Sequence, residues 1–417
     1  MNAAVLTVIG AIVLRSLFAT GLARWNVGAP VAMVVAGAVV AAFSPGSFGV
    51  VGTDTVFVQH AAEIILAVLL FVDATEVKGR RLWGRWPGLV GRTLFVAMPV
   101  ALALAVGAGA LLFPGQAFGV LLILACIVIP IDFAPADNVV RDHALPAKVR
   151  SVLNVESGYN DGLVSPVFLF ALALIGGRHA EAQSPLGALG SALPSSAIAL
   201  VVGVLMGALL AVVMDWATER DLTTVQSRRI IVLLMPVMVY FTTVAVDGNG
   251  FVAAFAAGTA YRYVYRGSVA RRLRRLGPGQ SPRQPVADSL NAGLLEDVTL
   301  LLTMVMWFVV GLATAYLFVV GISWQQVLYC VLALTVIRVL SILIGLAGSS
   351  MSVREQLLVG ALGPRGTTSI VFGLLAFNSL PDGPISELAL SVTVLCVLGS
   401  VLLHGMGAGP LTRKVSE

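Results

Sequence analysis

The sequence predicts an all-α polytopic membrane protein of about 13 transmembrane helices, forming one transporter-sized domain over residues 1–417. Hydrophobic residues make up 58% of the chain and charged residues 11%, whereas a soluble domain carries about 25% charged residues. Runs of about 20 mostly apolar residues, enough to cross ~30 Å of hydrocarbon, recur along the whole chain. In a membrane, runs of this length form the hydrogen bonds of their backbone groups as helices rather than as strands of a barrel.

The apolar runs give the expected order of spans. We expect helices over 3–22, 28–43, 58–77, 88–113, 116–139, 150–175, 195–215, 229–246, 249–264, 292–319, 324–346, 354–378 and 386–407.

Loop charges indicate how these spans are oriented, because Lys and Arg collect on the cytoplasmic side of a membrane. With the amino terminus outside and the carboxyl terminus in the cytoplasm, the outer loops hold only Arg178 of the 26 basic residues. The run RRLRR (271–275) is then an orientation signal rather than a nucleic-acid patch, although it could contact anionic membrane lipids. We expect a multi-pass protein of the cell (inner or plasma) membrane.

The sixth span carries acids at membrane depth, in ESGYND (156–161). A charge at the centre of a spanning helix costs at least ~2.5–3.5 kcal/mol, so such residues are kept for a function or a partner. Glu156 and Asn160 are four residues apart, as are Ser157 and Asp161, which puts them in a stripe on one helix face. Asp161 lies roughly 18 Å into the helix at ~1.5 Å per residue, near mid-bilayer. It is either an ion-binding group or a protonated carboxyl group that serves packing.

Two spans contain breaks. In the fifth, Pro130 and Pro135 flank Asp132 at a place where a straight helix cannot keep its backbone hydrogen bonds. Broken helices in transporters expose carbonyl groups that bind ions, so an acid between two prolines predicts a cation site. The alternative is a proline kink with a capping aspartate. In the twelfth span, Gly363 and Pro364 form a break immediately before Arg365.

The two broken spans are predicted to run in opposite directions and to cross near the midplane, as in an inverted-topology repeat. A guanidinium group in this setting requires a carboxylate, and we expect Arg365 to pair with Glu156 as a structural ion pair, leaving Asp161 for ion binding.

The remaining groups at membrane depth are one acid and the cysteines. Asp73 lies in LLFVDATEV of the third span. Cys126, Cys330 and Cys396 are an odd set in apolar spans and are expected to be packing residues rather than disulfide or metal ligands. No cofactor is expected.

Three motifs resemble the monovalent cation:proton antiporter family 1, the NhaP-type Na⁺/H⁺ exchangers. They are ESGYND (156–161), GPRGTTSIVFG (363–373) and DGNGFVAAFAAG (247–258). The resemblance implies a homodimer whose core bundle, at about 88–178 and 324–408, translocates the ion. The scaffold or dimerisation part would then be about 1–85 and 195–320.

The resemblance implies roles for those residues of this chain that match the motifs of the family by position. Asp161 would bind cation and proton alternately, and Asn160 would stand where electrogenic relatives have a second aspartate. Asp132 and Ser157 would add oxygen ligands to the transported alkali cation. Asp73 resembles an acidic position of the third span in some members.

The fifth span departs from the family pattern. Family members usually read Thr-Asp-Pro, whereas this chain has Ile131, Asp132 and Phe133. The threonine hydroxyl is missing, but the Ile131 carbonyl can still serve as a ligand.

The expected function is secondary active exchange of Na⁺, with Li⁺ or K⁺ as alternatives, for H⁺, serving pH homeostasis. Burial disfavours a charged carboxylate, so proton and cation compete for Asp161. With Asn160 neutral, the expected count is one proton per cation, which is electroneutral. Oxygen ligands suit alkali cations.

Other functions fit parts of the pattern. A transporter of the same fold could carry another ion or an organic anion, with Arg365 as substrate ligand. Two intramembrane aspartates could form an aspartyl-protease dyad, but the segments lack a G-x-G-D type setting, and no enzyme is expected. An ion channel would need a repeated filter or charged ring. The expected partners are the cation, the proton, membrane lipids and a second copy of the chain, with no nucleic acid.

Overall fold

The computed structural model describes residues 2–24, 27–43, 55–76, 83–133, 145–176, 181–275 and 288–405. Within these ranges every regular element is a helix, as the sequence predicts. The helices up to the middle of the chain are α1 (Asn2–Leu17), α2 (Ala19–Arg24), α3 (Ala29–Phe43), α5 (Thr55–Glu76), α6 (Pro87–Arg92), η1 (Thr93–Ala97), α7 (Met98–Leu112), α8 (Phe118–Val128), α10 (Ala147–Ile175) and α11 (Pro185–Glu219). The later ones are α12 (Val225–Val244), α13 (Gly250–Arg275), α14 (Asp288–Val320), α15 (Trp324–Leu332), η2 (Ala333–Ile337), α16 (Arg338–Gly345), α17 (Val353–Ala361), α18 (Thr367–Ser379), α19 (Pro384–Ser400) and η3 (Val401–Gly405).

These helices lie on the apolar runs from which spans were predicted. Among the described residues, seven helical stretches are long and apolar enough to cross a membrane by length and composition. Four others among these residues are shorter: Leu6–Leu17, Ala29–Phe43, Phe118–Val128 and Thr367–Ser379. The number of thirteen spans stays a prediction.

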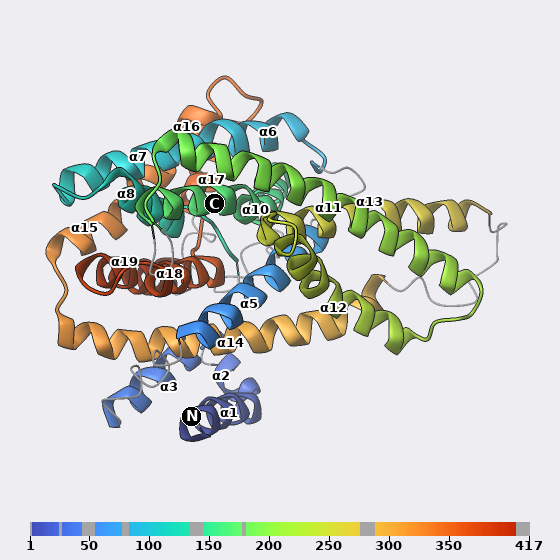
Figure 1. The fold of residues 1–417 in the computed structure, drawn as a ribbon, viewed down its shortest axis with the longest axis horizontal. Helices are drawn as coiled ribbons and strands as arrows, with labels where there is room; N and C mark the ends of the chain where they lie inside the picture. Colours follow the sequence, from blue (N-terminus) through green and yellow to red (C-terminus); the bar gives the residue numbers. More distant parts are fainter. Residues whose placement is uncertain are drawn as a thin grey trace.

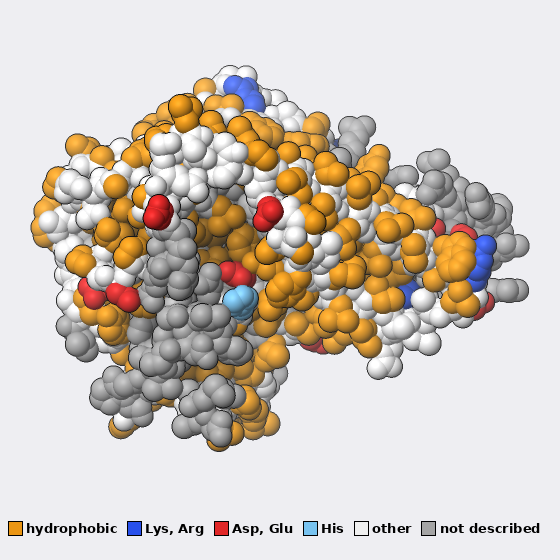
Figure 2. Space-filling model, viewed as in Figure 1, with side chains coloured by type: hydrophobic (Ala, Val, Ile, Leu, Met, Phe, Trp, Pro, Cys, Tyr) orange, Lys and Arg blue, Asp and Glu red, His pale blue; other side chains and the backbone are white. Residues whose placement is uncertain are grey.

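The surface and the interior have the polarity of a membrane protein. Large apolar side chains point outward, with Leu111 85% and Leu186 82% exposed. Figure 2 shows hydrophobic side chains over most of the visible face, Lys and Arg mainly at its edges, and a hollow near its centre. The interior, in contrast, contains a set of buried charged and polar side chains, including Arg365 at 0% and Asp161 at 3% exposure. The chain is therefore a multi-pass membrane protein whose interior holds polar groups.

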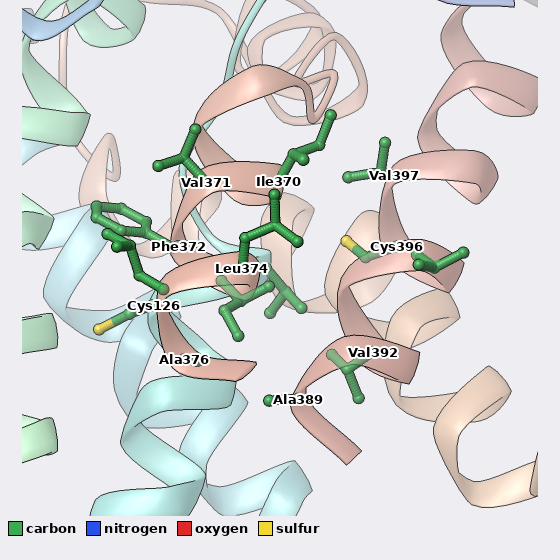
Figure 3. Packing of buried hydrophobic residues seen from close by; sticks show 14 of the residues in the cluster. Cys126, Ile370, Val371, Phe372, Leu374, Ala376, Ala389, Val392, Cys396 and Val397 are labelled. Carbon is green, nitrogen blue, oxygen red and sulfur yellow. The ribbon is translucent and has the colours of Figure 1, made fainter. Parts of the chain in front are cut away.

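The carboxyl-terminal helices occupy the middle of the bundle. In Figure 1, α18 and α19 lie between α14 on one side and the group of α7, α8 and α10 on the other, and both contact α8 and α14. Figure 3 shows how α18 is packed: its own Phe372 lies on the side of Cys126 of α8, and Cys396 and Val392 of α19 lie on the other side. All three cysteines are buried, and none is paired in a disulfide within the described residues.

Small residues let the remaining helices approach closely. A Cβ atom on Gly203 or Gly207 of α11 would lie 2.4 or 2.3 Å from the carbonyl oxygen of Ala253 or Ala257 of α13. Spacing by four residues puts both glycines on one helix face, as in other membrane helix pairs. In Figure 1, α11, α12 and α13 extend together to one end of the molecule.

Two interrupted helices share one irregularity. The helix made of α6 and α7 contains the five-residue π turn η1, and the helix made of α15 and α16 contains the five-residue π turn η2. These are the predicted fourth and eleventh spans, and η1 packs against α16. The same irregularity in corresponding spans favours the predicted inverted repeat.

Candidate functional site

Both predicted helix breaks are present. Helix α8 ends at Val128 and the chain is not helical from Ile129 to Phe133, since Pro130 cannot continue the backbone hydrogen bonds. Helix α17 ends at Ala361, and α18 begins at Thr367 after five residues without helix. Pro135 lies outside the described residues.

The two breaks cross and are joined by hydrogen bonds. The backbone N–H of Asp132 donates to the Pro364 carbonyl at 2.9 Å. The Asp132 carboxylate accepts the backbone N–H of Thr367, at 2.6 Å between N and Oδ2. Thr367 is the first residue of α18, so a negative charge lies at the positive end of that helix. A Cβ atom on Gly366 would lie 2.4 Å from Asp132 Oδ2, so this approach needs glycine.

Arg365 has the opposite role at the same crossing. Its Nε donates to the Val128 carbonyl, at the end of α8, and its Nη1 donates to the Gly363 carbonyl, both at 2.5 Å. Carbonyl groups at helix C-termini lack intrahelical partners and carry partial negative charge. Asp132 and Arg365 therefore neutralise helix ends of opposite sign.

The predicted ion pair between Arg365 and Glu156 is wrong. Glu156 pairs with Arg338 of α16, with Nη1–Oε1 at 2.5 Å and Nη2–Oε2 at 2.9 Å, and both side chains are buried. The bidentate geometry is the strong form of this interaction. Arg365 instead donates its hydrogen bonds to carbonyl groups that the helix breaks leave free. The prediction did not consider these acceptors.

Asp161 lies beside the crossing. Thr368 Oγ1 of α18 donates to Asp161 Oδ2 at 2.5 Å, while Asp161 Oδ1 is buried without a hydrogen-bond partner among the described residues. Asp132 is close enough that the two carboxylates interact as like charges. Sequence reasoning did not single out Thr368; the hydroxylic run that follows Arg365 was the available signal.

Asn160 connects α10 to the other broken helix. Its Nδ2 donates to the Ile131 carbonyl at 3.0 Å, so that carbonyl does lie at the site. Its Oδ1, like the hydroxyl groups of Thr367 and Ser369, is buried with no hydrogen-bond partner in the described part of the chain. The crossing thus gathers carboxylate, amide, hydroxyl and carbonyl oxygens, which are the ligands of hard cations.

The other two predicted site residues lie nearby without a demonstrated role. Ser157 is half-buried on α10, one turn before Asp161. Asp73 is half-buried on α5, which packs against α10, α13 and α18. Cation binding by either residue stays a prediction.

One set of contacts between α10 and α13 was not predicted. Arg262 of α13 donates from Nη2 to the Tyr159 hydroxyl at 3.0 Å, and both side chains are buried. Phe255 of α13 packs edge-on against Tyr159, with ring centroids 5.4 Å apart. A Cβ atom on Gly162 would lie 2.4 Å from the Phe255 ring, so the glycine after Asp161 makes room for this ring. These contacts join α10 to α13 at Tyr159 and Gly162, which lie close to Asp161 in the sequence.

Comparisons with known proteins indicate the family of the chain. The family model described as "Sodium/hydrogen exchanger, transmembrane" matches residues 7–414. An uncharacterised Na⁺/H⁺ exchanger of Escherichia coli K12, YjcE, is 27% identical over 226 residues, which span 51% of this chain and 38% of that protein.

The fold is also found among solved structures. The structure of the sodium proton antiporter MjNhaP1 of Methanocaldococcus jannaschii at pH 8 has a TM-score of 0.74 and 18% identity, covering 100% of this chain and 99% of that chain. An electron-microscopy structure of the same antiporter gives 0.75 and 19%, covering 99% and 98%. These likenesses show the fold. The family match over nearly the whole sequence shows more: the chain belongs to the sodium/hydrogen exchangers, a family of membrane transporters rather than enzymes.

Proposed function

We propose that the protein exchanges a monovalent alkali cation, Na⁺ or its neighbours Li⁺ and K⁺, for a proton, with Asp161 as the group that carries either ion. The observation that carries the proposal is the placement of this carboxyl group. It is 3% exposed, one oxygen accepts from Thr368, and the other has no hydrogen-bond partner among the described residues. A buried carboxylate in that state needs a positive charge.

The ligands available to a cation are hard. The Asp132 carboxylate, the Asn160 amide oxygen and the hydroxyl groups of Thr367 and Ser369 all lie on the crossing or beside it. Such oxygens suit Na⁺, Li⁺ and K⁺ better than soft metals. We also propose Ser157 as a further ligand of the cation and Asp73 as an acidic residue on the path of the ion.

Competition is the proposed coupling. Either a proton or a cation removes the charge of Asp161, and the bare carboxylate is costly in a low-dielectric interior. The loaded bundle can therefore change its access from one side of the membrane to the other, while the unloaded charged form cannot. Asn160 carries no charge, so one proton per cation is the simplest count.

We further propose the division into a core bundle at about 88–178 and 324–408 and a scaffold at about 1–85 and 195–320. The contacts of Tyr159 with Phe255 and Arg262, between α10 and α13, would then lie at their boundary. Homodimerisation through the scaffold, contact with membrane lipids, and an amino terminus outside with the carboxyl terminus in the cytoplasm belong to the same proposal.

An organic anion as substrate receives less support. Arg365 is 0% exposed, and two of its guanidinium nitrogens donate to the carbonyls of Val128 and Gly363. The third nitrogen, Nη2, is buried without a hydrogen-bond partner among the described residues, so a substrate carboxylate would have to reach a fully buried group.

The test is proton flux in proteoliposomes of the purified protein on addition of Na⁺, Li⁺ or K⁺ in turn. We expect cation-dependent proton movement by the native protein and its loss in Asp161→Asn, which should remain folded by size-exclusion chromatography. Asp382→Asn, an acid-to-amide change in the loop before α19, is the matched control and should retain exchange. Persistent exchange in Asp161→Asn would rule out the single-site scheme.

A further inference from the structure

Helix α13 is joined to two neighbouring helices by backbone contacts. A Cβ atom on Gly207 of α11 would lie 2.3 Å from the carbonyl oxygen of Ala257. A Cβ atom on Gly258 of α13 would lie 2.5 Å from the carbonyl oxygen of Phe71 on α5. No side chain fits between backbones this close, so α5, α11 and α13 pack as one unit. All of these contacts fall within the proposed scaffold.

Helix α10 is joined to a different set of helices. Its Asn160 donates to the Ile131 carbonyl, in the break after α8. Its Asp161 accepts from Thr368 of α18. The ion pair with α16 adds a third link. All of these links fall within the proposed core bundle, so the contacts between α10 and α13 lie at its boundary with the scaffold.

The two helices touch through side chains around Tyr159. Its hydroxyl group accepts from Arg262 Nη2 at 3.0 Å, and its ring packs edge-on against Phe255, with ring centroids 5.4 Å apart. Phe255 and Arg262 are seven residues apart, about two turns along one face of α13. Tyr159 therefore contacts α13 at two levels. The Phe255 ring also fills the space that a side chain at Gly162 would need.

Tyr159 and the proposed ion-binding group lie on the same turn of α10. Tyr159 precedes Asp161 by two residues, which puts the two side chains about 200° apart around the helix at ~100° per residue. Asp161 faces α18, and Tyr159 faces α13. Because a short stretch of helix moves as a rigid unit, any displacement of Asp161 relative to α13 displaces Tyr159 by a similar distance.

Contacts of this kind suit a boundary that separates. The bond between Tyr159 and Arg262 is 3.0 Å long, and a hydrogen bond is lost beyond about 3.5 Å, so a shift of about 1 Å breaks it. The backbone contacts of α13 with α5 and α11 part only when whole helices move. A hydrogen bond to a charged group nevertheless contributes more than one between neutral groups. The bond therefore holds the two helices in place until the boundary moves.

We propose that Tyr159 is a positioning residue of the exchanger. Its contacts with Arg262 and Phe255 hold the core bundle against the scaffold in the conformation of the structure, and they are released each time the bundle changes its access. The inference rests on the proposed function, from which it takes the transport cycle and the division into bundle and scaffold. The hold on the bundle can be measured without transport.

The structural test uses Tyr159→Phe, which keeps the ring and removes the acceptor of the Arg262 bond. The matched control is Tyr240→Phe. Tyr240 is 7% exposed, as is Tyr159, and its hydroxyl group donates to Glu63 at 3.0 Å. That bond joins α12 to α5 inside the proposed scaffold, so its loss should leave the boundary unchanged.

Pulsed electron spin resonance can measure the position of the bundle against the scaffold in nanodiscs. Spin labels on Leu222→Cys, after α11, and Val353→Cys, at the start of α17, sit at exposed positions on the two sides of the boundary, once the native cysteines are replaced. We expect two distances, one of them that of the structure. Tyr159→Phe should lower the population at the structure's distance, relative to the other, about tenfold, and Tyr240→Phe should change this ratio less than about twofold. An unchanged ratio in Tyr159→Phe would overturn the proposal, as would a single distance with and without Na⁺ in every protein.

A cross-link tests whether the contacts have to be released. Tyr159→Cys with Phe255→Cys, joined by a short reversible thiol cross-linker, should lose cation-dependent proton flux and regain it on reduction. The matched pair is Tyr240→Cys with Phe251→Cys, inside the scaffold, where the ring centroids are also 5.4 Å apart. This pair should keep its flux when cross-linked.

Flux that persists in the first cross-linked pair would overturn the proposal, as would an equal loss in both pairs. If Tyr159→Phe fails to fold, the comparison of the two cross-links decides. Absence of any cation-coupled flux in native protein would count against the proposed function instead, with the distance measurement still deciding the positioning role.

Discussion

The Glu156 carboxylate and the Arg338 guanidinium group face each other through two parallel hydrogen bonds, at 2.5 and 2.9 Å, in a part of the bundle where both side chains are buried. Arg338 also donates to the Val359 carbonyl of α17 at 3.3 Å. The pair thus links α10, which carries Asn160 and Asp161, to α16 and to α17, the helix before the second break. It fixes the helix of Asp161 against one of the broken helices.

Removing one partner of this pair should destabilise the protein. Arg338→Gln or Glu156→Gln alone leaves a buried charge without its counter-ion, which costs about 3–5 kcal/mol. We expect a lower midpoint of thermal unfolding in detergent and a lower yield for each single variant. The double variant should be less destabilised than the sum of the two, because it leaves no unpaired charge.

Arg92→Gln is the control for the loss of an arginine. Arg92 is half-buried and donates from Nε to the Gly345 carbonyl at 3.0 Å and from Nη2 to the Ala347 carbonyl at 2.5 Å, where α16 ends. Arg92→Gln should lower the stability of the protein much less than Arg338→Gln. An Arg338→Gln protein as stable as Arg92→Gln would contradict a structural role for the pair.

The identity of Glu156's partner shows where sequence reasoning reaches its limit. Both helix breaks follow from Pro130 and Pro364, because proline chemistry is local. The partner does not, because Arg338 and Arg365 are both guanidinium groups at membrane depth, and the sequence gives no distance to either. Carbonyl groups freed by the breaks satisfy Arg365, and Arg338 is left for Glu156.

The same limit applies to the site. Asp161, Asn160 and Asp132 were found because acids and amides are rare in spanning helices. Thr368 was missed because a hydroxyl group in an apolar helix commonly donates to its own helix, as Thr393 does to the Ala389 carbonyl at 2.7 Å. Only the crossing of the chains shows that Thr368 faces a carboxylate.

Thr368 should support cation binding at Asp161. Its hydrogen bond at 2.5 Å stabilises the charged carboxylate, and hydrogen bonds to charged groups contribute about 1.5–3 kcal/mol. In Thr368→Val the proton should compete more strongly, so the apparent KM for Na⁺ at fixed pH should rise roughly tenfold or more. Thr368→Ser keeps the hydroxyl group and should stay within a few-fold of native. Equal KM values for the valine and serine variants would refute this role.

Two substitutions of Asp132 should distinguish its role as a helix cap from the role of its negative charge. Asp132→Asn keeps an oxygen that can accept from the Thr367 N–H, whereas Asp132→Ala loses this helix cap at a cost of about 1 kcal/mol. We expect only the alanine variant to unfold at lower temperature. Both variants should bind the cation more weakly, because both lose the carboxylate. A fall in stability of the same size in the asparagine variant would indicate that the charge, rather than the cap, holds α18.

The proposed orientation can be tested with engineered cysteines. The three native cysteines are buried, so they can be replaced to give a background without reactive thiols. Gln183, in the loop before α11, and Leu222, in the loop after it, are both exposed and flank one long helix. In intact cells a membrane-impermeant thiol reagent should label Gln183→Cys and leave Leu222→Cys unlabelled until the membrane is opened. The reverse pattern would place the amino terminus in the cytoplasm.

Transport should be electroneutral, because Asn160 places an uncharged amide next to Asp161. Moving one net charge through 100 mV is worth about 2.3 kcal/mol. An electroneutral exchanger instead should change its Na⁺-driven proton flux by less than about twofold when potassium and valinomycin impose that potential. Asn160→Asp adds a second carboxylate, so flux in that variant should become dependent on potential. It should also be less stable, since an ionised aspartate cannot donate to the Ile131 carbonyl as Nδ2 does at 3.0 Å. A native protein whose rate follows the imposed potential would contradict the one-to-one count while leaving Asp161 as the binding group.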